Sequence, residues 1–154
     1  MENNFTEDNN FASVGAIVLR EKKILLVRHT YGAAKDKLLN PGGFIKKDEL
    51  PTDAVKREVL EETGITVNPI GMLSIRCSPT GWYMVFLAEY VSGEPKPDGH
   101  ENSEALFMDC DELLNRKDAT DTVKMLLKSA LSKKPLIPVD TERSRLLFAS
   151  NEDL

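Results

Sequence analysis

The sequence has few cysteines, no long apolar run and no excess of positive charge. Its two cysteines, Cys77 and Cys110, form no C-x-x-C motif and are too few for a disulfide framework. We expect both to be small buried side chains in a reducing compartment. No apolar run approaches the roughly 20 residues that span a bilayer, and the acidic, polar first ten residues are unlike a targeting peptide. These absences predict a cytoplasmic protein with no membrane partner.

The net charge indicates which classes of partner the chain can bind. The chain carries 25 acidic and 20 basic residues, a formal net charge of -5. General nucleic-acid binding needs a basic surface, so we expect no nucleic-acid polymer as a partner. An acidic protein can still act on an anionic small molecule if a metal ion mediates contact with its carboxylates. The length of 154 residues and the 41% hydrophobic content predict one globular domain.

The order of strand-like and helix-like segments predicts an α+β domain. We expect a polar tail at residues 1–10, the domain at 11–134 and a C-terminal extension at 135–154. Strand patterns occur at residues 11–20, 22–30, 38–43, 65–78, 82–92 and 105–109, and helical patterns at 52–63, 110–116 and 121–133. The first two strands predict a hairpin. Residues 141–154 are expected to form a short helix, packed on the body or on a second copy.

The helix at residues 52–63 has the most unusual composition. Thr52 is its expected N-cap, and Gly64 fits the position after its last turn. Glu58, Glu61 and Glu62 fall within an arc of roughly 100° that adjoins the apolar face. Carboxylates at the edge of a core are costly unless something compensates them. Oxygen ligands of this type suit Mg²⁺ or Mn²⁺.

The spacing of residues 43–65 resembles the Nudix box, the signature of the Nudix hydrolase family. It runs Gly43, five residues, Glu49, seven residues, Arg57-Glu58-Val59, one residue, Glu61-Glu62, one residue, Gly64-Ile65. The strand order on either side also resembles the Nudix fold, over about residues 11–133. The resemblance implies an α/β/α sandwich with a mixed central sheet.

The resemblance implies metal-dependent cleavage of a pyrophosphate bond in a nucleoside diphosphate linked to another moiety. Mg²⁺ is the expected metal, with Mn²⁺ as a substitute. The implied metal ligands are Glu58, Glu61, Glu62 and the backbone carbonyl of Gly43. Arg57 and Glu49 are implied to orient this cluster. Independently of the family, Arg57 is placed to pair with Glu61 four residues on, or to reach back to Glu49.

The sequence offers three candidates for the general base. Family members use a glutamate of the box or one on a later acidic loop, which residues 98–113 resemble. Glu101 is the first candidate on position, followed by Glu104, with Glu62 as the choice inside the box. The alternative, that the two loop glutamates are ordinary surface charges, stays open at this point.

Four residues are candidates for substrate contact. Trp82 and Tyr83 follow a turn and offer an aromatic face to a base, and strand alternation allows only one of them to face the site easily. Arg28 and Arg76 are candidates for phosphate contact. Sheet packing for the aromatics and solvated strand ends for the arginines are the competing interpretations.

The chain also departs from the family pattern just before its Pro-Gly-Gly turn. Many members have a tryptophan three residues before the proline and an apolar residue directly before it. Here these positions hold Leu38 and Asn40. Stacking that such a tryptophan provides must therefore come from another residue or be absent.

The sequence favours an ADP-ribose or nucleotide-sugar type of substrate. Alternatives are a nucleoside triphosphate, a dinucleoside polyphosphate, or a non-catalytic Nudix-fold nucleotide sensor. A sensor would be expected to lose carboxylates of the box, and this chain retains them all. The related isopentenyl-diphosphate isomerases need a cysteine before the box, where this chain has none. Homodimer formation through the C-terminal extension is a further expectation.

Overall fold

A computed structural model describes residues 11–132, 135–141 and 144–149. The predicted tail at residues 1–10 lies outside this range. The strands are β1 (Ala12–Arg20), β2 (Lys23–His29), β3 (Leu38–Leu39), β4 (Gly42–Phe44), β5 (Thr66–Ser78), β6 (Gly81–Ser92), β7 (Asn102–Asp109), β8 (Ile137–Thr141) and β9 (Ser144–Ala149). The helices are α1 (Pro51–Thr63), α2 (Cys110–Asn115) and α3 (Asp121–Leu131).

The first seven strands form one mixed sheet. β1 pairs in parallel with β6, from Ala12 opposite Trp82 to Leu19 opposite Glu89. The other pairings in this sheet are antiparallel: β1 with β2 and β4, β2 with β3 and β7, and β5 with β6. The predicted hairpin between β1 and β2 is confirmed. The pairing of β4 with β1 holds the Pro-Gly-Gly turn against the centre of the sheet.

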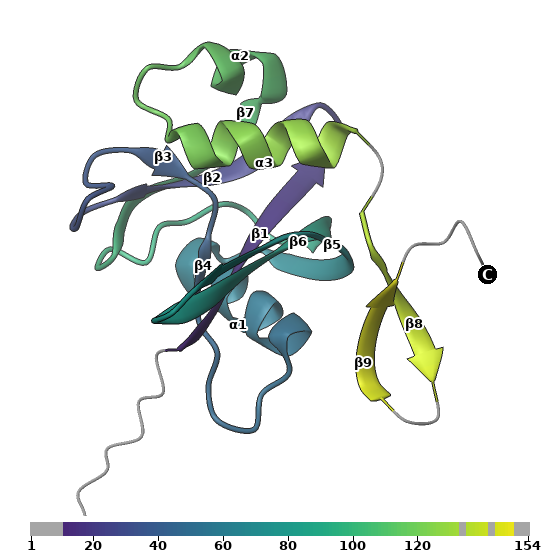
Figure 1. The fold of residues 1–154 in the computed structure, drawn as a ribbon. Coiled ribbons are helices and arrows are strands. Elements are labelled where there is room, and N and C mark those ends of the chain that lie inside the picture. The colour runs from purple at the N-terminus through teal and green to yellow at the C-terminus, as the bar shows by residue number, and fades with distance from the viewer. Residues whose placement is uncertain (1–10, 133–134, 142–143, 150–154) are drawn as a thin grey trace, which may run out of the picture.

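Helices cover both faces of this sheet, with α1 on one side and α2 and α3 on the other (Figure 1). Alternate residues of β1 pack against the helices on the two sides of the sheet. Val14, Ala16 and Val18 belong to the apolar cluster that includes residues of α1, whereas Ile17 belongs to the cluster that includes residues of α2 and α3. The predicted α+β sandwich with a mixed central sheet is therefore confirmed.

The helix that carries the glutamates begins one residue before the expected N-cap. Leu50 occupies the cap position in an extended conformation with no side-chain capping bond, and Pro51 starts the helix. The assignment of Thr52 as N-cap is therefore wrong. A proline suits the first turn because its missing N–H would have no partner there. Gly64 follows the helix in the left-handed region at φ 71°, as expected, and its N–H bonds Leu60 O.

The C-terminal extension differs from the expectation. Residues 144–149 form strand β9, which pairs antiparallel with β8, so the predicted helix is wrong there; residues 150–154 lie outside the described range. This hairpin follows Leu136, which exchanges two backbone hydrogen bonds with Met72 of β5, at 2.7 and 3.0 Å. The extended, proline-containing segment before β9 supplies a pairing partner that a local helical pattern does not reveal.

Cys110 is buried, as expected, but Cys77 is exposed. Cys77 lies opposite Trp82 in the last turn of the β5–β6 hairpin, where the strands extend beyond the helix layers and the last four residues of β5 are exposed. None of the helices in the described part of the chain is long and apolar enough to cross a membrane.

Candidate active site

An open cleft of about 1650 Å³ lies beside α1. Its volume exceeds the roughly 300–1,000 Å³ of ordinary small-molecule pockets, so it is large enough for an extended ligand. Residues from five parts of the chain line it, among them Glu58 and Glu62 of α1, Gly42 and Gly43 of β4, His29 and Tyr31, Arg76 and Tyr83, and Glu101.

Glu62 is the most deeply placed carboxylate of the cleft. Its residue is only 3% exposed, because α1 packs against the sheet along the adjoining positions. Its Oε2 accepts a hydrogen bond from the backbone N–H of Gly42 at 3.1 Å. Burial raises the pKa of Glu62 to about 8, and the negative charges of Glu58 and Glu101 act in the same direction. Glu62 is therefore a buried carboxylate that accepts a hydrogen bond from an uncharged N–H group, and a bound cation would compensate its negative charge.

Glu58 lies one turn earlier on α1 and faces the backbone of β4. A Cβ atom built on Gly43 would lie 2.4 Å from Glu58 Cδ, so any larger residue there would displace the carboxylate. Burial raises the pKa of Glu58, although the neighbouring Arg57 opposes the shift. The glycine of the turn is therefore required for the close approach of Glu58.

Arg57 connects the box residues to one another. Its Nε and Nη2 donate to the two oxygens of Glu49 at 2.7 and 2.9 Å. Nη1 donates to Glu58 at 2.7 Å and to Glu61 at 3.3 Å, and Nη2 also reaches Phe44 O at 3.0 Å. The sequence left open whether Arg57 pairs with Glu61 or Glu49, and the structure shows both. Hydrogen bonds from this guanidinium lower the pKa of Glu49.

Glu61 differs from the other two glutamates of α1. Its side chain is 55% exposed, and it meets Arg57 rather than lining the cleft. Only Glu58 and Glu62 of the expected ligand triad therefore face the cleft in this structure.

The two loop glutamates occupy different places. Glu101 lines the cleft, and its charge raises the pKa of both Glu58 and Glu62. Glu104 instead pairs with Arg28 at 3.0 Å. The loop at Glu101 is fixed because the N–H of Thr30 bonds Glu101 O at 2.9 Å and Asp98 Oδ1 accepts from the N–H of Glu101 at 3.1 Å.

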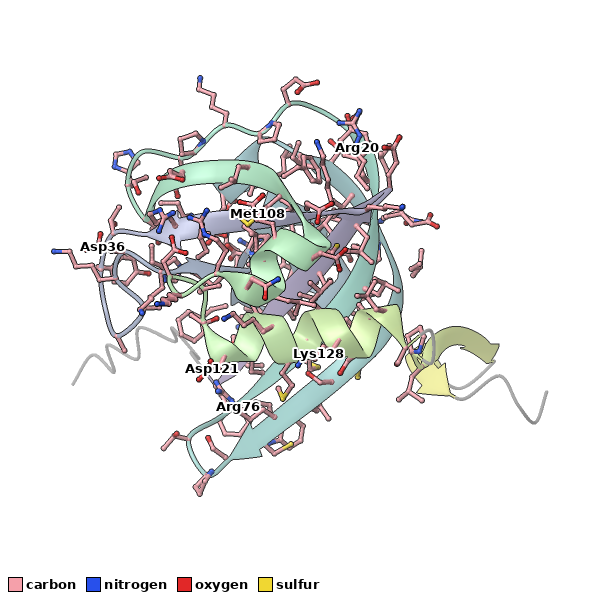
Figure 2. The ribbon with its side chains drawn as sticks, turned by 90° about the horizontal axis from the view of Figure 1, so that it is seen from above. Arg20, Asp36, Arg76, Met108, Asp121 and Lys128 are labelled. Atoms are coloured by element: carbon pink, nitrogen blue, oxygen red, sulfur yellow. The ribbon has the colours of Figure 1, made fainter. Side chains whose placement is uncertain are left out.

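The four residues predicted to contact the substrate differ in whether they line the cleft. Arg76 and Tyr83 line the cleft, with the Arg76 guanidinium 5.4 Å from the Tyr83 ring centre. Figure 2 shows Arg76 close to the tip of the β5–β6 hairpin. Trp82 is 47% exposed and is not among the residues that line the cleft, although the Phe11 ring on which it packs is. Tyr83 is thus the aromatic of the pair that faces the site.

The guanidinium of Arg28 is already bound by other groups of the protein. Its guanidinium binds Glu104 and Asp118, each at 3.0 Å, and the carbonyl of Asp36 at 2.8 Å. It is not among the residues that line the cleft. A phosphate contact by Arg28 would require these ion pairs to break.

His29, Tyr31 and Asn40 are among the cleft residues that had not been predicted as site residues. The His29 and Tyr31 rings stack at 5.6 Å with planes 7° apart. Their position follows from the pairing of β2 with β7, which sets His29 opposite Asn102, next to Glu101. A histidine at the end of an apolar strand was the available signal. Leu38 is fully buried, so the family tryptophan position holds a core residue here.

The donors of the cleft suit a hard divalent cation. Within residues 11–132 and the described parts of the extension, no three His, Cys, Asp or Glu side chains converge as a ready-made metal cluster. Mg²⁺, however, usually binds through one or two carboxylates plus waters and substrate phosphates. Glu58 and Glu62 provide two such carboxylates, whose burial-raised pKa values show that a cation would relieve a charge penalty.

Comparison with known proteins gives the same assignment as the motif. The NUDIX domain profile matches residues 9–128. An ADP-ribose pyrophosphatase of Methanocaldococcus jannaschii is 32% identical over 107 residues, covering 66% of this chain and 63% of the relative. The NAD-capped RNA hydrolase NudC of Photobacterium profundum is 38% identical over 98 residues, covering 62% of this chain. The chain spans only 36% of that relative's length.

Solved structures agree in fold. A NUDIX hydrolase from Nitrosomonas europaea superposes with a TM-score of 0.69 at 26% identity, covering 81% of this chain and 90% of that one. An ADP-ribose pyrophosphatase from Streptococcus suis gives 0.62 at 26% identity, covering 80% and 92%. The profile match over most of the chain, the intact box and the shared fold show that this chain belongs to the Nudix family.

Proposed function

We propose that this Nudix protein hydrolyses the pyrophosphate bond of a nucleoside diphosphate linked to another moiety, of ADP-ribose or nucleotide-sugar type. The observation that carries the proposal is the group of Glu58, Glu62 and Glu101 around one cleft, with two of them buried enough to raise their pKa. The names of the Methanocaldococcus and Streptococcus relatives support the substrate class.

The metal site consists of Glu58 and Glu62, with the Gly43 carbonyl beside them and Glu61 at the exposed end. Bound Mg²⁺, or Mn²⁺ in its place, neutralises phosphate oxygens and activates water. Arg57 keeps Glu58 in place, and its two bonds to Glu49 fix the guanidinium itself. This is the usual arrangement of an outer charge that orients a metal ligand.

Glu101 is the general base of the proposal. It lines the cleft from the loop before β7, near enough to Glu58 and Glu62 for its charge to raise the pKa of both. Among the described residues its carboxylate has no ion-pair partner. A free carboxylate in that position can accept the proton of the attacking water. Glu104 is less suitable because Arg28 already holds it.

Substrate binding falls to the part of the cleft that Arg76 and Tyr83 line. The Arg76 side chain is exposed and has no carboxylate partner among the described residues, so it can take a phosphate. Lys46 lines the same cleft and adds a second positive charge near the phosphates. Such charges attract an anionic substrate to an otherwise acidic protein.

The test is hydrolysis of a panel of ADP-ribose, nucleotide sugars, dinucleoside polyphosphates and nucleoside triphosphates. Each is incubated with Mg²⁺, with Mn²⁺ and with chelator, and products are separated by chromatography. The proposal expects metal-dependent release of a nucleoside monophosphate from ADP-ribose or a nucleotide sugar. Preferred cleavage of triphosphates or dinucleoside polyphosphates would overturn the substrate class. Nucleotide binding without cleavage of any panel member would overturn hydrolysis and favour a sensor.

A further inference from the structure

Asn40 and Tyr83 form a hydrogen-bonded pair in the lining of the cleft. Asn40 precedes the Pro-Gly-Gly turn and is only 6% exposed, and Tyr83 comes from β6. Asn40 Nδ2 donates to the Tyr83 hydroxyl at 3.0 Å and to the carbonyl of Pro41 at 3.3 Å. Both residues line the cleft. This contact joins the turn that carries Gly43 to the strand that carries Tyr83.

The space for this pair depends on a glycine in β1. A Cβ atom on Gly15 would lie 2.1 Å from the Tyr83 hydroxyl oxygen and 2.6 Å from Asn40 Nδ2. No alanine or larger residue at position 15 is compatible with the pair as it stands. Three separate segments of the chain therefore meet at this one polar contact within the sheet.

One hydrogen atom of this pair, that of the Tyr83 hydroxyl, is available for a further hydrogen bond. An amide NH₂ has two hydrogens, and those of Asn40 are directed to the Pro41 carbonyl and the Tyr83 oxygen. The Tyr83 oxygen is therefore an acceptor from Asn40, and its own hydrogen has no acceptor among the described residues. Burial raises the pKa of Tyr83, so the hydroxyl stays protonated throughout the neutral range.

We propose that Asn40 orients the Tyr83 hydroxyl as a hydrogen-bond donor to an oxygen atom of the bound nucleotide. The inference rests on the proposed function and adds a specificity-determining donor, Tyr83, with Asn40 as its positioning residue. The neighbouring Arg76 guanidinium, 5.4 Å from the Tyr83 ring centre, makes this part of the cleft complementary to an oxygen-rich group. Phosphate and ribose oxygens share that chemistry.

The first test is Tyr83→Phe, compared with Tyr90→Phe as a matched control. Tyr90 lies on the same strand, but its hydroxyl donates to Gly93 O at 2.9 Å and it does not line the cleft. Loss of one neutral hydrogen bond should raise KM roughly 3- to 10-fold, with kcat changed by less than about twofold. Tyr90→Phe should leave both constants unchanged. A KM for Tyr83→Phe equal to that of the wild type would overturn the inference.

The second test is a double-mutant cycle. Asn40→Leu installs the apolar residue common in the family and should raise KM about as much as Tyr83→Phe does. If Asn40 acts through the hydroxyl, Asn40→Leu should have no further effect on KM in the Tyr83→Phe background. Additive effects would overturn its role as a positioning residue. Thermal denaturation of each variant identifies any loss of folded protein.

The substrate panel separates the sources of the oxygen atom. An equal loss for ADP-ribose and for a nucleoside triphosphate would indicate a phosphate oxygen, whereas a loss confined to ADP-ribose would indicate its second ribose. If the wild type cleaves nothing, the proposed hydrolysis fails, and the dissociation constant for ADP-ribose with Mg²⁺ replaces KM in the same comparison. Absence of any ADP-ribose binding by the wild type would overturn the inference as well.

Discussion

Arg57 binds Glu49 through two hydrogen bonds, from Nε to Oε1 at 2.7 Å and from Nη2 to Oε2 at 2.9 Å. The remaining N–H groups of the same guanidinium reach Glu58, Glu61 and the carbonyl of Phe44. All five donors of the side chain are therefore used. One arginine thus fixes the position of a cleft carboxylate relative to the segments before and within α1.

Arg57→Lys should lower kcat/KM about 10- to 100-fold, the usual cost of removing a group that orients a metal ligand. Lysine keeps the charge but has three donors on a flexible stem, so it cannot reproduce the planar fork. Steady-state kinetics at saturating Mg²⁺ measure the effect.

The matched control for this change is Arg116→Lys. Arg116 also holds a carboxylate with two bonds, to Asp118 at 2.8 and 2.9 Å, but it does not line the cleft. This variant should keep nearly full activity. Equal losses in the two variants would show that Arg57 acts through general stability rather than through Glu58.

Glu62→Gln should reduce turnover at least about 100-fold while the protein still folds, because it removes a charged metal ligand and keeps its shape. The amide oxygen can still accept the hydrogen bond that Gly42 N–H donates at 3.1 Å. Kinetics together with circular dichroism measure the two properties. Glu104→Gln, whose carboxylate pairs with Arg28 outside the cleft, is the control. A Glu62→Gln protein with near-full activity would refute the assigned role.

The metal-free protein should lose stability as the pH rises from about 4.5 toward 8. The pKa of Glu62 is raised to about 8 in the folded state, so the folded protein binds more protons than the unfolded chain in this interval. The free energy of unfolding therefore falls with increasing pH. With chelator present at pH 8, Glu62→Gln should be more stable than the wild type by on the order of a few kcal/mol.

Denaturant unfolding at pH 5 and pH 8 measures this effect. At pH 5 the advantage of Glu62→Gln should be much smaller, because Glu62 is then mostly protonated in the folded state. Mg²⁺ should stabilise the wild type more than the variant at pH 8. An unchanged difference between the two proteins at both pH values would contradict the burial-based account of Glu62.

Much of the site was predictable because its residues are close in sequence. Helical periodicity placed Glu58 and Glu62 next to the apolar face, and the spacing back to Glu49 agrees with the bonds that Arg57 makes. The glycine at position 43 followed instead from the resemblance to the Nudix box, and the structure adds that its lack of a Cβ admits Glu58. Local geometry was sufficient for the glutamates of the helix and for the partners of Arg57.

The rest of the site depends on strand pairing, which sequence periodicity does not fix. His29 joins the cleft because β2 pairs with β7, and Arg28, one residue earlier, is held by Glu104 and Asp118 instead. The pair of Asn40 and Tyr83 likewise depends on β1, which pairs on one side with β4, just after Asn40, and on the other with β6, which carries Tyr83. Contacts between segments 40 or more residues apart carry no local signal. The strand at residues 144–149 was missed for a different reason: its partner β8 is close in sequence, but the local pattern of residues 141–154 resembles a helix.

Asn102→Leu should stabilise the protein by about 1–2 kcal/mol, measured by denaturant unfolding. Asn102 is fully buried at the start of β7, and neither its Nδ2 nor its Oδ1 has a hydrogen-bond partner in the described part of the chain. Leucine has nearly the same shape and removes both unpaired polar atoms. The backbone N–H of Asn102 keeps its bond to Asp98 at 3.0 Å, so the loop beside Glu101 is preserved.

Asn115→Leu is the control for this substitution, since Asn115 is exposed and its Nδ2 already donates to Asp111 O at 2.9 Å. Because the Asn115 amide already makes a hydrogen bond, removing it should not increase the free energy of unfolding. Because Asn102 lies opposite His29 and next to Glu101, activity should be measured on the same samples. A destabilised Asn102→Leu protein would show that the amide binds an internal water, and the expectation of an uncompensated polar group would then be wrong.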